Sequence, residues 1–164
     1  MTGEPKAFEE FLLRVGRLNY SWTNTESLLI HFIAGLSGCD KETAVIIFLT
    51  LNTSRARVDL VERLAKMPRV GDDEREQVLA LTREMVRLAV LRNRYNHCIY
   101  AFDRENGSTR SIMMRISDRK RDIRVGESHD LDQNAIAEIE EAILRIAELN
   151  TRFWSSAKAL GYPI

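Results

Sequence analysis

Apolar side chains recur every three or four positions along most of this chain, which is the spacing of amphipathic helices. The first such stretch extends from Phe8 to Leu36 and is followed by Ser37-Gly38, so it predicts one helix of about 30 residues with a glycine stop. Residues 44–51 follow Asp40 and predict a second, capped helix. This segment is rich in β-branched residues and also fits a buried strand, but the cap and the helical neighbours favour a helix.

Three further helices are expected. Residues 58–65 carry an apolar stripe after Asn52-Thr53-Ser54, which predicts a short third helix. A longer fourth helix opens with Asp72-Asp73-Glu74, whose carboxylates suit the positive end of the helix dipole. The last helix begins after a cap at Asp130 or Asp132 and carries its own apolar stripe.

A β-hairpin is expected between the last two helices. Apolar runs at 99–102 and 111–116 flank Asn106-Gly107, and Asn-Gly between such runs is the strongest short-range hairpin signal. Residues 122–125 predict a short third strand. The pattern therefore predicts a mainly α fold in one domain, residues 1–164, with a hairpin insertion at about 99–126 before the last helix.

Composition narrows the class of protein. Hydrophobic residues make up 45% and charged residues 29%, as in a globular domain, and the net charge is +0. The chain therefore has no general electrostatic attraction to nucleic acid or to anionic membranes. Cys39 and Cys98 show neither metal-ligand nor disulfide-framework spacing, and the N-terminus lacks the pattern of a signal peptide. We expect a cytoplasmic protein without a membrane span, a metal site or a cofactor.

Side chains that can take part in catalysis or binding cluster where the fourth helix ends, in Arg92-Asn93-Arg94-Tyr95-Asn96-His97. Arg92 continues the apolar line of that helix, and Asn93 follows it directly. This segment resembles the Arg-x4–6-His motif of the HEPN superfamily. A second match to the motif, Arg124 to His129, contains a glycine and has no helical period, so His97 is the preferred histidine.

The resemblance covers about residues 3–98 and 130–160 only, and it implies an up-down bundle of four to five helices. Many members of the family are metal-independent ribonucleases, and others are non-catalytic binding modules. In the catalytic case, His97 exchanges a proton with RNA and Arg92 holds the scissile phosphate. Asn93 and Asn96 orient these groups. An early acidic residue often approaches the motif arginine in this family, and Glu26 is the candidate here; the alternative is a carboxylate that faces water.

Contacts with RNA are expected from residues around the motif. Tyr95 is expected to stack on a base. Phosphate contacts are expected from Arg94, Arg104, Arg110 and Arg115. The last three lie in the hairpin, where charges at this density also serve as a solvated edge that prevents aggregation. One departure from many catalytic members is that Cys98 follows the histidine where they have glycine.

Two functions therefore stay open. The first is a dimeric HEPN-type endoribonuclease, the toxin of a toxin–antitoxin or phage-defence pair, with an antitoxin or a nucleotidyltransferase as its partner. The second is a non-catalytic HEPN-like module that dimerises or binds a protein, a ligand or nucleic acid through the same face. The sequence does not specify a preferred RNA or a biological trigger.

Overall fold

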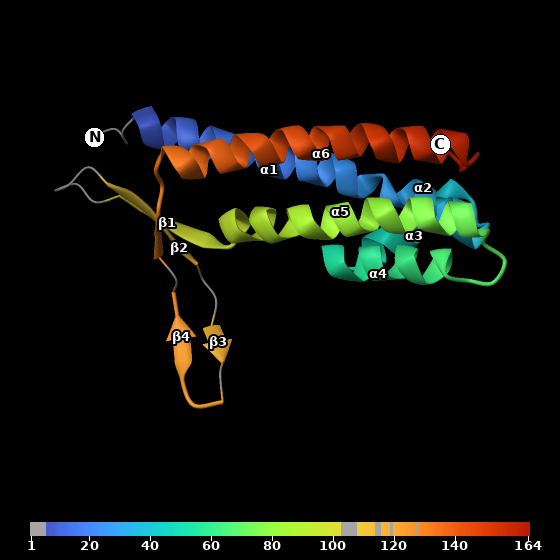
Figure 1. Cartoon of the computed structure of the whole chain (residues 1–164), viewed down its shortest axis with the longest axis horizontal. Coiled ribbons are helices and arrows are strands. Elements are labelled where there is room, and N and C mark those ends of the chain that lie inside the picture. The colour runs from blue at the N-terminus through green and yellow to red at the C-terminus, as the bar shows by residue number, and fades with distance from the viewer. Residues whose placement is uncertain (1–5, 103–107, 114–115, 119, 127) are drawn as a thin grey trace. The chain divides into compact units, whose positions relative to one another are not determined.

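The computed structural model describes residues 6–102, 108–113, 116–118, 120–126 and 128–164 of the chain (Figure 1). The fold is mainly helical, as the apolar spacing predicts, with a small antiparallel sheet before the last helix. Among the described residues, no helix is both long enough and apolar enough to cross a membrane.

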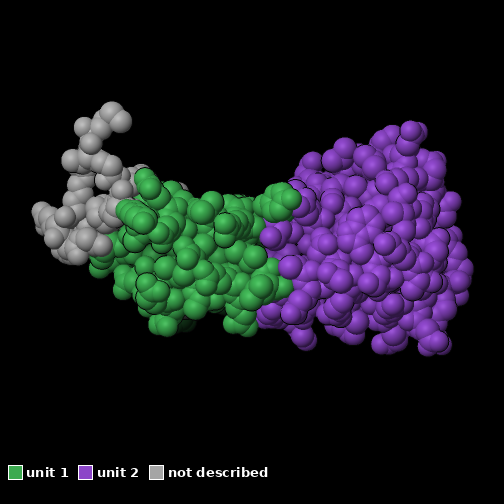
Figure 2. Space-filling model, turned by 90° about the horizontal axis from the view of Figure 1, so that it is seen from above, with its two compact units in different colours: residues 1–20, 89–144 green, residues 21–88, 145–164 purple. Residues whose placement is uncertain are grey.

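The chain folds into two compact units (Figure 2). Unit 1 comprises Met1–Tyr20 and Ala89–Leu144, and unit 2 comprises Ser21–Leu88 and Arg145–Ile164. Each unit combines segments that lie far apart in the sequence, so neither is formed by one continuous stretch. The proposed motif and the hairpin belong to unit 1, whereas Glu26 belongs to unit 2.

The first apolar stretch forms two helices rather than the single helix expected. The six helices of the described chain are α1 Lys6–Ser27, α2 Leu29–Ser37, α3 Lys41–Thr50, α4 Ser54–Ala65, α5 Asp72–Asn96 and α6 Gln133–Ala159. The interruption lies at Leu28, whose N–H donates to the Thr25 carbonyl at 3.1 Å in a tighter turn than an α-helix makes. Just before it, the hydroxyls of Thr25 and Ser27 donate to backbone carbonyls, and such bonds compete with regular helix geometry. Apolar spacing continues across the break, which is why the sequence pattern did not reveal it.

The predicted caps are confirmed at the short helices. The Asp40 carboxylate accepts from the Thr43 N–H at 2.8 Å, so residues 41–50 form a helix and not a strand. Thr53 caps α4 by accepting from the Ala56 N–H at 3.1 Å. Of the two candidates for α6, Asp132 is the cap. Gly38 ends α2 with φ 74°, a left-handed conformation that glycine adopts without strain.

The predicted hairpin is confirmed, but its strands begin and end at other residues than expected. Strands β1 Cys98–Phe102 and β2 Thr109–Met113 pair antiparallel, and β5 Ser128–Asp130 pairs with the other side of β2. The register aligns Tyr100, Ser111 and His129 in one row across this sheet. Because directly opposite residues of antiparallel strands point to the same face, these three side chains share a face. The expected Asn106-Gly107 turn lies outside the described residues.

The short strand expected at 122–125 pairs differently from a simple extension of the hairpin. It forms β4 Ile123–Val125, which pairs with β3 Ile116–Asp118 in a separate two-stranded sheet. The apolar run expected at 111–116 is therefore divided between β2 and β3. The third strand of the main sheet is β5, which the sequence pattern did not indicate because it is only three residues long and exposed.

The core of unit 2 is built around aromatic rings. Phe32 packs edge-on against Phe153 and Tyr162, with ring centroids 5.1 and 5.3 Å apart. Tyr162 lies so close to Gly35 that a Cβ there would fall 2.1 Å from its ring. Its hydroxyl donates to Glu74 at 2.6 Å, which joins the C-terminal segment to the start of α5.

Unit 1 has a smaller aromatic core at the point where α5 meets the sheet. Phe11 of α1 contacts Tyr95 and Tyr100 edge-on, with ring centroids 6.1 and 5.5 Å apart. The Arg14 guanidinium of α1 lies 2.8 Å from Glu140 of α6. These contacts hold the last turn of α5 between α1, α6 and the sheet, and this turn carries the proposed motif.

Candidate functional site

Four polar residues of the proposed motif lie on the last turn of α5 and its exit. Asn93, Asn96 and His97 are exposed, and Arg92 is half-buried. The His97 N–H donates to the Asn93 carbonyl at 3.3 Å, so the helical path extends to the histidine. Asn93 and His97 consequently share one face of the helix. The imidazole forms no side-chain hydrogen bond with any residue that the structure describes.

Arg92 and His97 lie about 140° apart on an ideal helical wheel, because they are five positions apart along the helix. The Arg92 side chain reduces this separation by bending toward its neighbour. Its Nη1 donates to Asn93 Oδ1 at 3.0 Å. The guanidinium is therefore tied to the residue that shares a face with His97, and Asn93 is the link between the two.

Two of the four residues between them, Arg94 and Tyr95, connect α5 to α6. Arg94 Nη1 donates to both carboxylate oxygens of Glu138 at 3.0 Å, and the Tyr95 hydroxyl donates to Oε2 at 3.1 Å. Tyr95 is 4% exposed. Its burial, together with the Glu138 carboxylate, raises the pKa of Tyr95 to about 12. The prediction that Tyr95 stacks on a base is wrong, because its ring is already enclosed in the core of unit 1.

The exit of α5 is fixed by two further contacts. The Cys98 thiol donates to the Arg94 carbonyl, and the Tyr100 hydroxyl donates to the Tyr95 carbonyl. Burial raises the pKa of the Cys98 thiol, which disfavours the thiolate that a nucleophile needs. Cys98 therefore closes the end of the helix, and its thiol is turned toward the backbone.

Glu26 is buried in unit 2, as one of the two expectations for it held, and an arginine is its partner. Its carboxylate is 5% exposed, and Oε2 lies 3.3 Å from Arg57 Nη1. Arg57 is held by the carbonyls of Phe48 and Leu51 and lies 4.1 Å above the Phe48 ring. Within the described chain Glu26 thus forms a salt bridge with Arg57, whereas the expected pairing with Arg92, a residue of unit 1, stays a prediction. The alternative of a water-facing carboxylate is also wrong.

The predicted basic hairpin is only partly described. Arg110 is exposed, and its Nε lies 3.2 Å from Asp130 Oδ1, so a carboxylate on the adjacent strand offsets its charge. Arg104 and Arg115 lie outside the described residues. Arg94 is likewise offset by Glu138, so the two described members of the predicted phosphate-binding set are both paired with acids.

A polar groove of about 240 Å³ lies beside Arg94 on unit 1. The last turn of α5, strands β2 and β5 and the start of α6 line it. Its lining includes Ser111, His129, Asp130 and Glu138. His129 is the histidine that the sequence pattern set aside, and the short strand β5 brings it here. The sequence signal for His129 was the second match to the motif, Arg124 to His129. That match was set aside because the segment has no helical period.

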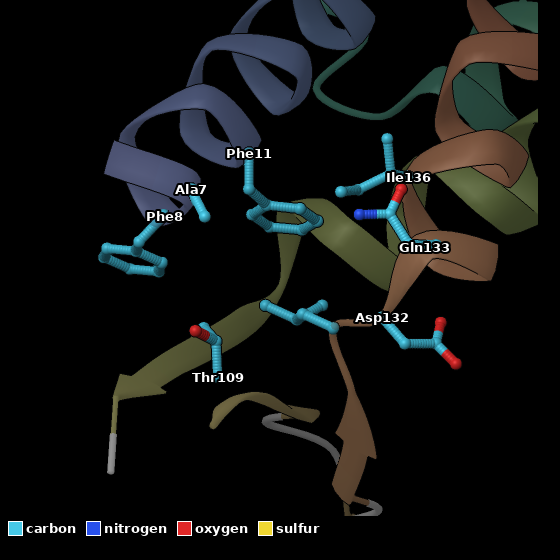
Figure 3. A pocket seen from close by; sticks show the side chains of 8 residues that line it. Ala7, Phe8, Phe11, Thr109, Asp132, Gln133 and Ile136 are labelled. Atoms are coloured by element: carbon cyan, nitrogen blue, oxygen red, sulfur yellow. The ribbon is translucent and has the colours of Figure 1, made fainter. Parts of the chain in front are cut away.

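A second, apolar hollow of about 290 Å³ lies on the same unit (Figure 3). Phe11 of α1 and Ile136 of α6 point toward each other across it. Asp132 and Gln133 contribute the polar part of its lining. Its ionisable side chain is Asp132, whose two carboxylate oxygens accept hydrogen bonds from Asn134 and Ala135, so we do not take this hollow as the centre of reaction.

The described residues contain no group of three or more histidine, cysteine and acidic side chains placed to bind a metal ion. No protein-family model, no curated protein and no solved structure matches this chain significantly. The functional reading accordingly depends on the geometry of the site and on the motif.

Proposed function

We propose that this protein is a metal-independent endoribonuclease of the HEPN type, with its reacting groups at the end of α5. The observation that carries the proposal is the bond from Arg92 to Asn93, on the face that also bears the exposed His97. Arg94, Tyr95 and Cys98 each have a structural partner, whereas the imidazole has none within the described chain. The two side chains that the motif requires for chemistry, Arg92 and His97, are half-buried and exposed respectively.

These residues suit cleavage by the 2′-hydroxyl of RNA. A neutral His97 takes the proton from the 2′-hydroxyl, and the 2′-oxygen then attacks the adjacent phosphorus. The bond from phosphorus to the 5′-oxygen breaks, and an imidazolium or water returns a proton to that oxygen. Arg92 stabilises the charge on the phosphate oxygens through its planar guanidinium. The products are a 2′,3′-cyclic phosphate and a 5′-hydroxyl.

Charge limits how the RNA is held. The chain has net charge +0, and both Arg94 and Arg110 lie beside carboxylates. Non-specific affinity for RNA comes largely from neutralised phosphates, so this protein is expected to contact few of them. We therefore expect weak, local binding of single-stranded RNA around one scissile phosphate.

The chemistry is tested with two matched oligonucleotides, one all-RNA and one with a single 2′-deoxynucleotide at the mapped cleavage position. The proposal predicts cleavage of the first in EDTA and no cleavage of the second at that position, because the attacking hydroxyl is missing. Equal cleavage of both would contradict it, since a hydrolytic water does not need the 2′-hydroxyl.

The alternative, a non-catalytic binding module, has one observation in its favour. Ile46 and Leu49 lie one turn apart on α3 and are 67% and 64% exposed. Adjacent exposed aliphatic side chains are typical of a surface that binds another protein. For this alternative, Ile46→Lys would abolish association with a partner or a second copy in light-scattering measurements, and RNA would stay intact under all conditions.

A further inference from the structure

The polar groove beside Arg94 is lined by side chains that take no part in the proposed cleavage reaction. Its lining has three carboxylates, those of Asp130, Asp132 and Glu138, against the single guanidinium of Arg94. A groove with this excess of negative charge repels phosphate. It is therefore unsuited to the RNA backbone, although it lies one helical turn from His97 on α5.

Some polar atoms of the groove are already committed to the fold. Glu138 accepts from Arg94 and Tyr95, and both oxygens of Asp132 accept hydrogen bonds at the start of α6. Two acceptors are not committed to any described residue. They are Asp130 Oδ2, because Arg110 lies beside Oδ1, and Asn134 Oδ1, because only the amide nitrogen of Asn134 donates within the fold.

The groove also retains hydrogen-bond donors. In its hydrogen bonds to Glu138, Arg94 uses only Nη1, so this carboxylate does not engage the Nε–H and Nη2 groups. The groove thus offers two acceptors on the β5–α6 side and a guanidinium donor pair on the α5 side. Leu131 and Ala135 add apolar surface to the same lining.

We infer that this groove binds a guanine base of single-stranded RNA, an inference that rests on the proposed ribonuclease function. Guanine has two adjacent N–H donors on its Watson–Crick edge and two adjacent acceptors, O6 and N7. The donors match Asp130 and Asn134, and the acceptors match the fork of Arg94. Uracil has one N–H between two carbonyls, and adenine has a single exocyclic donor, so neither satisfies both sides. Bases of single-stranded RNA are accessible for this kind of recognition.

Binding is tested without cleavage by using fluorescent oligodeoxynucleotides, which lack the 2′-hydroxyl. Fluorescence anisotropy is measured for TTGT, TTIT and TTTT, where I is inosine and lacks the 2-amino donor. TTGT is expected to bind about tenfold more tightly than TTIT, since one such hydrogen bond contributes about a factor of ten, and TTTT is expected to bind more weakly than TTIT. Equal affinities for all three would overturn the inference.

Variants assign the preference to the groove. Asp130→Asn and Asn134→Ala are each expected to lower the ratio of the affinity for TTGT to that for TTTT by about tenfold. Asp73→Asn removes the same charge from an exposed position of unit 2 and should leave this ratio unchanged. A guanine preference that persists in both groove variants would also overturn the inference.

The outcomes for the two proposals are separable. RNA cleavage without any base preference would leave the ribonuclease function standing and overturn the guanine groove. A guanine preference that depends on Asp130, in a protein that never cleaves RNA, would support the groove and overturn the ribonuclease function.

Discussion

The carboxylate of Glu26 and the guanidinium of Arg57 form a buried ion pair in unit 2, with Oε2 and Nη1 3.3 Å apart. Arg57 also donates to the last carbonyls of α3 and stacks on Phe48. One arginine of α4 therefore neutralises a charge on α1 and closes the end of α3. This role of Arg57 is structural.

Removing Arg57 should destabilise the protein strongly. Arg57→Ala leaves Glu26 buried without a cation, so the free energy of unfolding is expected to fall by about 3–5 kcal/mol in urea denaturation. Arg55 is the matched control, because it pairs with Asp59 at an exposed position. Arg55→Ala should change the free energy by less than about 1 kcal/mol. Similar losses for both variants would contradict a specific role for the buried pair.

Two helical glycines should respond to alanine with opposite signs. Gly35→Ala places a Cβ 2.1 Å from the Tyr162 ring, so we expect a loss of about 1–3 kcal/mol in the free energy of unfolding. Gly16 has no atom within 4 Å of the added Cβ, so Gly16→Ala should stabilise by about 0.4–1 kcal/mol. Denaturation of the two variants in parallel checks the sign. A stabilising Gly35→Ala would show that Tyr162 does not occupy this position.

Stability should fall at alkaline pH because of buried tyrosines. Burial raises the pKa of Tyr95 to about 12 in the folded chain, above the ordinary phenol value of 10.0. The neutral phenol is thus favoured by folding, and its contribution is complete below pH 10 and is lost as pH rises from 10 toward 12. Tyr95→Phe should flatten this loss, and the exposed Tyr20→Phe should not. A parent protein with constant stability across this range would contradict the burial of Tyr95.

Much of the fold could be predicted from the sequence, because apolar spacing, caps and the Asn-Gly pair are local signals. The break at Leu28 could not, since apolar spacing continues through it and the cause is a set of hydroxyl-to-backbone bonds. The same limit applies to the site. The burial of Glu26 could be predicted, because Glu26 lies on the apolar line of its helix. Its contact with Arg57 could not, because that contact depends on how α3 and α4 fold back. His129 enters the groove only through the pairing of β5 with β2.

Arg92 should affect cleavage more than folding. Arg92→Ala is expected to lower kcat/KM for RNA cleavage by about 10²–10³, the cost of losing one preorganised donor to the reacting phosphate. Arg83→Ala removes an exposed arginine from the same helix and should leave the rate unchanged. If Arg92→Ala instead left cleavage intact, Arg92 would not be the group that holds the phosphate.

The central claim is that His97 transfers a proton during metal-free RNA cleavage. The most direct measurement is incubation of the parent and His97→Ala proteins with mixed cellular RNA in EDTA, with circular dichroism to confirm that both are folded. The account predicts fragments with 2′,3′-cyclic phosphate ends from the parent and intact RNA with the variant. Equal cleavage by a folded His97→Ala protein would contradict it.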